Sequence, residues 1–134
     1  MYQCRLHDLI AEKRVAVGMY MVSGSPMAAE IIGQTGLDFV IIETEHGLLS
    51  PMDLAPLVEV VSILESNDVT SIVRVPSGDP FFIGRSLDAG AMGVMAPKVK
   101  TKEDVEQVVS AARFPPEGDR GVGDLAPANR YVQP

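Results

Sequence analysis

The sequence lacks most features of secreted, membrane and nucleic-acid-binding proteins. It contains one cysteine, Cys4, so no disulfide can form within the chain, and a reducing compartment fits. No apolar run reaches the roughly 18 residues of a membrane span, and residues 1–14 are too charged for a signal peptide. The net charge of −7 disfavours nonspecific contact with nucleic acid or anionic membranes, because both contacts need basic surface. We therefore expect a cytoplasmic protein that binds neither.

What the chain does contain is an alternation of apolar strands and helices. Its 134 residues, 46% of them hydrophobic, suffice for one domain with a substantial core. Four apolar or β-branched runs predict strands, at residues 15–20, 37–43, 69–75 and 91–99. A helix is predicted after each strand, over residues 25–36, 50–66, 79–90 and 101–114, with N-caps at Ser25, Ser50, Asp79 and Thr101. A proline follows each of the first three caps, and Asp104 is placed to complete a capping box with Thr101. A shorter amphipathic helix is predicted over residues 6–13.

The pattern of strands indicates the fold class. Strands without polar alternation, each followed by a helix, favour a parallel sheet in an α/β fold. Two architectures fit: an open, doubly wound sheet, as in flavodoxin-like regulatory or binding domains, and a (β/α)8 TIM barrel. Four units are half of such a barrel, since a complete one takes about 250 residues. Residues 115–134 are rich in proline and glycine, so we expect a loop-rich tail that serves a site or leads to a further segment.

Ionisable side chains gather where the second and third strands end, and parallel α/β folds bind their ligands at this edge. The second strand ends in Glu43, Glu45 and His46, and the third ends in Arg74. An arginine in an otherwise apolar strand needs a carboxylate partner or an anionic ligand. From position alone, Arg74 is either a ligand-binding residue or the ion-pair partner of a glutamate. His46 is either a proton carrier or a residue satisfied by the backbone.

Other ionisable positions have simpler interpretations when taken alone. Lys98 follows the fourth strand and fits a solvated residue at the edge of the sheet. Asp88 fits a turn before Gly90, and His7 fits an exposed position near the terminus. No glycine-rich phosphate loop is present, because the segment "GVGD" neither follows a strand nor precedes a clear helix. The sequence therefore indicates no nucleotide site.

Four segments, taken together, resemble the HpcH/HpaI aldolase family in order and spacing. They are "GLDFVIIETEHG", "SIVRVPSGDP", "SLDAGAMGVMAPKV" and "ARFPPEGDRGVG". The resemblance covers essentially the whole chain and implies a (β/α)8 barrel, of which residues 1–134 form the N-terminal half. Its members are metal-dependent class II pyruvate aldolases, such as 4-hydroxy-2-oxoheptanedioate aldolase and 2-dehydro-3-deoxyglucarate aldolase. They are usually trimers or hexamers.

The resemblance also implies roles for three residues. His46 matches the catalytic base, Asp88 matches the acidic residue that pairs with it, and Arg74 matches the arginine that binds pyruvate and stabilises its enolate. Glu43 and Glu45 would be supporting acids. This assignment is chemically reasonable, because a histidine suits proton transfer near neutral pH and a fixed cation stabilises an enolate oxygen.

The chain departs from the family pattern at several positions. The family binds its metal through a glutamate and an aspartate on later strands, so the Mg²⁺, Mn²⁺ or Co²⁺ expected for a full-length member has no ligand set within these residues. Glu43 stands where an aspartate is frequent, and Lys98 replaces a residue that is commonly methionine or histidine.

The sequence thus predicts part of a carbon–carbon lyase. Its substrates would be 4-hydroxy-2-oxo or 2-oxo-3-deoxy acids, cleaved to or formed from a 2-oxo acid and an aldehyde through a metal-stabilised pyruvate enolate. The alternative is an inactive fragment, or a half-module that binds small molecules without turnover.

Overall fold

A four-stranded parallel sheet forms the centre of the molecule. In the computed structural model, which describes residues 4–123 and 126–129, the strands are β1 (Gly18–Met21), β2 (Phe39–Glu43), β3 (Thr70–Arg74) and β4 (Gly93–Met95). Their order in the sheet is their order in the sequence, and every pair is parallel. Right-handed crossovers that all run one way place the connecting helices on a single face. The doubly wound alternative is therefore wrong for the described sheet, because that fold reverses its strand order.

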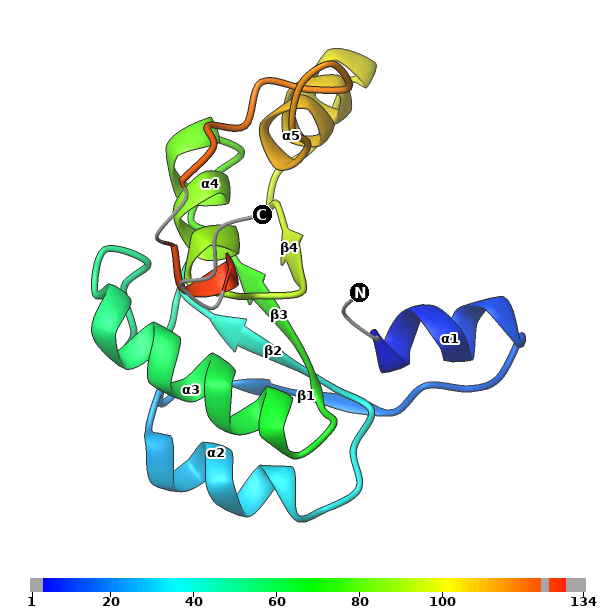
Figure 1. Cartoon of the computed structure of the whole chain (residues 1–134), viewed down its shortest axis with the longest axis vertical. Coiled ribbons are helices and arrows are strands. Elements are labelled where there is room, and N and C mark those ends of the chain that lie inside the picture. The colour runs from blue at the N-terminus through cyan, green and yellow to red at the C-terminus, as the bar shows by residue number, and fades with distance from the viewer. Residues whose placement is uncertain (1–3, 124–125, 130–134) are drawn as a thin grey trace.

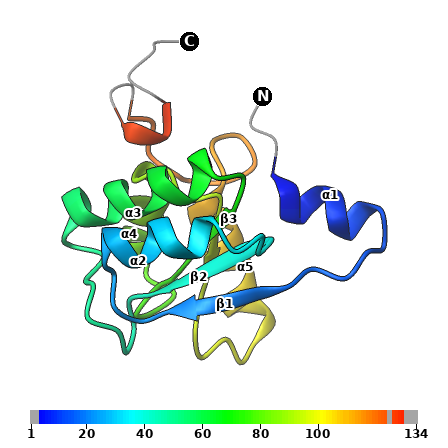
Figure 2. The ribbon, with the colours of Figure 1, turned by 90° about the horizontal axis from the view of Figure 1, so that it is seen from below.

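The helices cover the convex side of this curved sheet (Figure 1). They are α2 (Pro26–Gly33), α3 (Leu54–Ser66), α4 (Pro80–Asp88) and α5 (Lys102–Ala112), followed by a short 3-10 helix, η1 (Pro127–Asn129). The N-terminal helix α1 (Arg5–Ala11) stands apart from them in both views, whereas α2 and α3 lie side by side (Figure 2). This arrangement is the one-sided layering of a partial barrel, as the sequence predicts.

Three of the four predicted helix starts are confirmed by their caps. The Ser25 hydroxyl accepts the N–H of Ala28, the Asp79 carboxylate accepts the N–H of Phe81, and Thr101 forms a capping box with its partner three residues on. The predicted cap at Ser50 is wrong. The Ser50 hydroxyl and carbonyl instead accept N–H groups two and three residues on, at 3.1 and 3.0 Å, which forms a turn. The helix α3 then begins only at Leu54.

Alternate side chains of each strand divide between two environments. Met21, Ile42 and Val73 lie in register on the face that packs against the helices and are almost completely buried. One position before them, Tyr20 and Ile41 belong to the row that faces the concave side. Glu43 and Arg74, the last residues of β2 and β3, share that concave face, so the end of the sheet presents polar side chains there.

The glycine- and proline-rich tail is docked where the structure describes it. The N–H groups of Asp119 and Arg120 donate to the carbonyls of Ser110 and Arg113, each at 2.9 Å. No helix among residues 4–123 and 126–129 is long and apolar enough to cross a membrane.

Candidate active site

Two glutamates and an arginine meet at the carboxyl end of the sheet. Glu43 and Arg74 are register partners on β2 and β3, and Glu43 Oε2 lies 2.9 Å from Arg74 Nη1. The other Glu43 oxygen, Oε1, accepts the backbone N–H groups of Glu45 and His46 at 2.8 and 3.1 Å. Glu43 therefore anchors both the arginine and the loop that follows its own strand.

The second glutamate connects this pair to two further basic groups. The Glu45 side chain is 5% exposed, and its Oε2 lies 2.6 Å from Arg74 Nη2. Its Oε1 lies 3.3 Å from Lys98 Nζ and 3.5 Å from His46 Nε2. Glu45 Oε2 has no aligned hydrogen bond, so its contact with the guanidinium is an ion pair only. One buried carboxylate thus lies among all three bases of the site.

Burial and partners act in opposite directions on the ionisation of these groups. Burial favours the protonated Glu43 carboxyl, but the N–H donors of His46 and Glu45 and the charge of Arg74 outweigh it, so the pKa of Glu43 is lowered. Burial likewise disfavours the charged guanidinium, but Glu43 and then Glu45 raise the pKa of Arg74. Both partners of the Glu43–Arg74 pair are therefore fully ionised at neutral pH.

The loop that carries His46 depends on the glycine that follows it. A Cβ atom at Gly47 would overlap the carbonyl oxygen of Glu43 and approach the carbonyl oxygen of Val22 to 3.0 Å. The backbone can therefore turn this tightly only with glycine at this position. The turn leaves the His46 side chain 70% exposed, next to the buried carboxylate of Glu45.

One residue of the site was missed in the sequence. Tyr20 lies on the concave face of β1, and its hydroxyl donates to Met95 Sδ at 3.6 Å. Met95 is in turn the register partner of Arg74, so Tyr20 lies beside the arginine. The alternation of side chains along the first strand was the signal that would have placed Tyr20 on the same face.

Asp88 lies away from this group of side chains in the structure. It is the last residue of α4, and its Oδ1 accepts a hydrogen bond from Arg120 Nη2 at 2.8 Å. Both residues line a pocket of about 540 Å³ between α4, α5 and residues 119–121. The α4 helix runs back along the sheet from the end of β3, so its last residue lies toward the opposite end of the sheet from Arg74. No contact joins Asp88 and His46, both of which the structure describes. The pairing implied by the family pattern therefore stays a prediction.

The described residues do not suit a divalent metal. Residues 4–123 and 126–129 contain no group of three or more histidine, cysteine or carboxylate side chains able to hold one. The oxygens of the site's two carboxylates, Glu43 and Glu45, already face a guanidinium, an ammonium and two backbone N–H groups. Those cationic neighbours would repel Mg²⁺ or Mn²⁺.

The fold and the site together define a class. Parallel strands in sequential order, with helices on one face and ionisable side chains at the strands' carboxyl ends, are typical of part of a (β/α)8 barrel with its site at that edge. The model of the HpcH/HpaI aldolase/citrate lyase family matches residues 16–132. The chain belongs to this family.

Individual relatives agree with this assignment. A 5-keto-4-deoxy-D-glucarate aldolase of Escherichia coli is 34% identical over 122 residues, which are 91% of this chain and 46% of the relative. The crystal structure of an HpcH/HpaI aldolase from Desulfitobacterium hafniense has a TM-score of 0.86 at 28% identity, covering 97% of this chain and 49% of that one. A structure of the citrate synthase SbnG has a TM-score of 0.81 at 31% identity, over 90% and 48%. The chain thus spans about half the length of these relatives.

Proposed function

We propose that this chain supplies the proton-transfer and enolate-binding side chains of a carbon–carbon lyase. Its substrates would be 4-hydroxy-2-oxo or 2-oxo-3-deoxy acids, and its products a 2-oxo acid and an aldehyde. The main support is the contact of one buried carboxylate, Glu45, with Arg74, Lys98 and His46 at the carboxyl edge of the sheet. Membership of a family of aldolases and lyases supports the same reaction class.

In the cleavage direction, His46 accepts the proton of the substrate's 4-hydroxyl group. The electron pair of the bond between C3 and C4 then forms a double bond between C2 and C3, C4 leaves as an aldehyde, and negative charge develops on the C2 oxygen. Arg74 stabilises that charge from a fixed position, and a proton delivered to C3 completes pyruvate. The exposure of His46 suits it to exchange protons with solvent.

The divalent metal that the family pattern implies, Mg²⁺, Mn²⁺ or Co²⁺, enters this proposal in a limited way. It would act as a Lewis acid on the substrate oxygens. Its ligands would be side chains other than those of residues 4–123 and 126–129, which form no ligand set. We therefore assign no step of the reaction to a metal bound by the described residues.

A second candidate function is binding without turnover. The missing ligand set in the described residues favours it, because a module that keeps Arg74 and Lys98 can hold a 2-oxo acid without cleaving it. Pyruvate binding in the presence of EDTA, without exchange of its methyl protons, would support this second function.

The proposed reaction is tested by the exchange of pyruvate methyl protons for deuterium, followed by proton NMR with each metal or with EDTA. In a protein that also supplies the metal ligands, we expect His46→Asn to slow metal-supported exchange by about 10²- to 10⁴-fold, the usual effect of losing a general base. The matched control is His7→Asn, because His7 is an exposed histidine on α1, outside the site. Equal exchange by the parent and the His46 variant would remove His46 from the mechanism.

A further inference from the structure

Lys98 has a backbone conformation that its position does not readily explain. Its φ of +58° lies in the left-handed region, which costs a residue with a side chain about 1 kcal/mol. Among the residues that the structure describes, two other non-glycine residues share this region, Lys13 and Asp68, but each directly follows the last turn of a helix, where such a conformation is common. Lys98 instead follows the strand β4. Conformations of this kind persist where the surrounding structure fixes them, often at functional sites.

The charge balance of the site shows what Lys98 contributes. Glu43 and Glu45 carry two negative charges, and Arg74 alone offsets only one of them. Lys98 Nζ, 3.3 Å from Glu45 Oε1, supplies the second positive charge. Without Lys98 the site would carry a net negative charge before His46 is protonated, and it would repel an anionic 2-oxo acid.

Lys98 also has fewer carboxylate partners than Arg74. The Arg74 guanidinium contacts both glutamates and is 26% exposed, whereas the Lys98 side chain is 75% exposed and contacts only Glu45. An ammonium group has three donors, so two remain for a ligand. Arg74 and Lys98 approach opposite oxygens of the Glu45 carboxylate, so two separate cations lie on either side of it at this edge of the sheet.

We propose that Lys98 is a specificity-determining residue of this site. Its ammonium group binds a second carboxylate, at the far end of a 2-oxo acid whose first carboxylate and oxo group lie at Arg74. The inference rests on the proposed function for the placement of the 2-oxo acid. It adds that this chain prefers dicarboxylic over monocarboxylic 2-oxo acids and that Lys98 is the cause.

The test compares two ligands of equal carbon length, 2-oxoglutarate and 2-oxopentanoate, which differ in the terminal carboxylate. Dissociation constants are measured by NMR titration of the full chain at fixed ionic strength. An ion pair with an exposed ammonium is worth up to about fivefold in affinity, so the parent should bind 2-oxoglutarate about three- to fivefold more tightly. Lys98→Met should bring the ratio to about one or below, and Lys98→Arg should keep most of it.

The matched control is Lys100→Met, which removes the same charge two residues away. The Lys100 side chain has no ion pair with either glutamate of the site. Its variant should therefore keep the parent's ratio, which separates a local contact from a change in net charge. A ratio of one in the parent, an unchanged ratio in Lys98→Met, an equal loss in both lysine variants, or no binding of either ligand would each overturn the proposal.

Measuring pyruvate exchange on the same samples separates this inference from the proposed function. Exchange without a preference for the dicarboxylic acid overturns only the role of Lys98. A preference that depends on Lys98, without exchange of pyruvate protons even in a protein that also supplies the metal ligands, supports the binding role and overturns the lyase.

Discussion

Replacing Glu43 by glutamine should destabilise the chain, because glutamine cannot satisfy both sets of partners of the carboxylate. Glu43 is buried, and both of its carboxylate oxygens accept hydrogen bonds. One oxygen accepts from two backbone N–H groups, and the other accepts from Arg74 Nη1 at 2.9 Å. A glutamine side chain has one oxygen, so its NH₂ group must face either the guanidinium or the two N–H donors. At least one charge-assisted hydrogen bond is lost, worth roughly 1.5–3 kcal/mol.

The expected loss is smaller than the loss on breaking a fully buried ion pair. Removing one partner of a fully buried pair costs about 3–5 kcal/mol, because the other charge is left alone. Here Arg74 keeps Glu45 at 2.6 Å and is 26% exposed. We therefore expect Glu43→Gln to lower the free energy of unfolding at pH 7 by about 2 kcal/mol, measured by urea denaturation at a fixed protein concentration.

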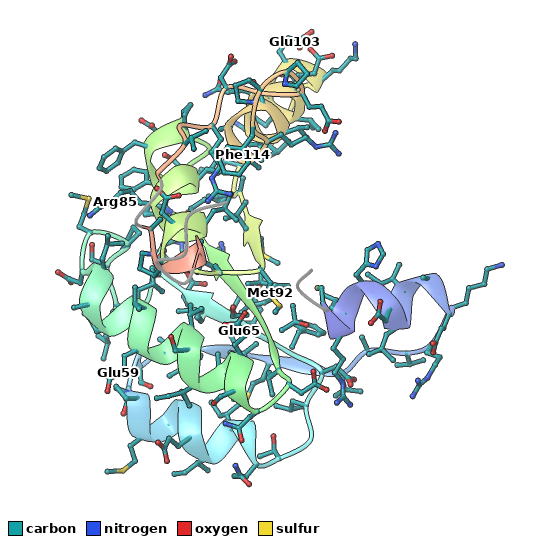
Figure 3. All side chains as sticks on the ribbon, viewed as in Figure 1. Glu59, Glu65, Arg85, Met92, Glu103 and Phe114 are labelled. Carbon is teal, nitrogen blue, oxygen red and sulfur yellow. The ribbon has the colours of Figure 1, made fainter. Side chains whose placement is uncertain are left out.

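The pH dependence checks the cause of this loss. The folded pKa of Glu43 is lowered, so its ionisation stabilises the fold above its ordinary value of 4.5, and that contribution is lost as the pH falls through the folded pKa. The difference between parent and variant should therefore shrink below pH 4.5. The control is Glu59→Gln, which changes an exposed glutamate on the outer side of α3 (Figure 3) and should cost less than about 0.5 kcal/mol. A Glu43 variant as stable as this control, or a difference independent of pH, would refute the reasoning.

Three further predictions address the loop, the arginine and the sheet. Gly47→Ala should distort the His46 loop, because its Cβ meets the Glu43 carbonyl; we expect a loss of about 1–3 kcal/mol in urea denaturation, and a neutral result would contradict the turn. Arg74→Lys keeps the charge but loses the planar fork, so pyruvate binding should weaken about tenfold or more, as should methyl-proton exchange in a protein that also supplies the metal ligands. Unchanged binding and exchange would leave Arg74 a structural ion pair. The outer strands β1 and β4 of the described sheet expose unpaired edges, so light scattering after size exclusion should show a mass above 14.4 kDa, and a stable monomer would contradict this.

Local patterns in the sequence predicted most of the fold. Capping residues at Ser25, Asp79 and Thr101 and the apolar strand runs are local signals, and the structure confirms them. Ser50 misled because serine followed by proline also favours a turn, while Asp53, the residue at the true start, forms no side-chain cap.

The sequence predicted where the site lies but not most of the contacts within it. The parallel sheet brings Glu43 beside Arg74 by register alone, so the strand ends sufficed to place them together. The ion pairs of Glu45 with Lys98 and of Asp88 with Arg120 join residues far apart in sequence through loops without periodicity. Such pairings depend on how the loops pack, and no local pattern specifies that.

The structure divides the site into a fixed part and an adjustable part. Arg74 is held by two glutamates, one of which is itself held by backbone N–H groups, so its charge is oriented before any ligand arrives. A preoriented cation needs little reorganisation as charge develops on an enolate oxygen. The side chains of His46 and Lys98 are at least 70% exposed, and each forms one ion pair, with Glu45, so these side chains can move to meet a ligand. Chemistry common to all 2-oxo acids would then depend on the fixed arginine, and discrimination among substrates on the exposed side chains.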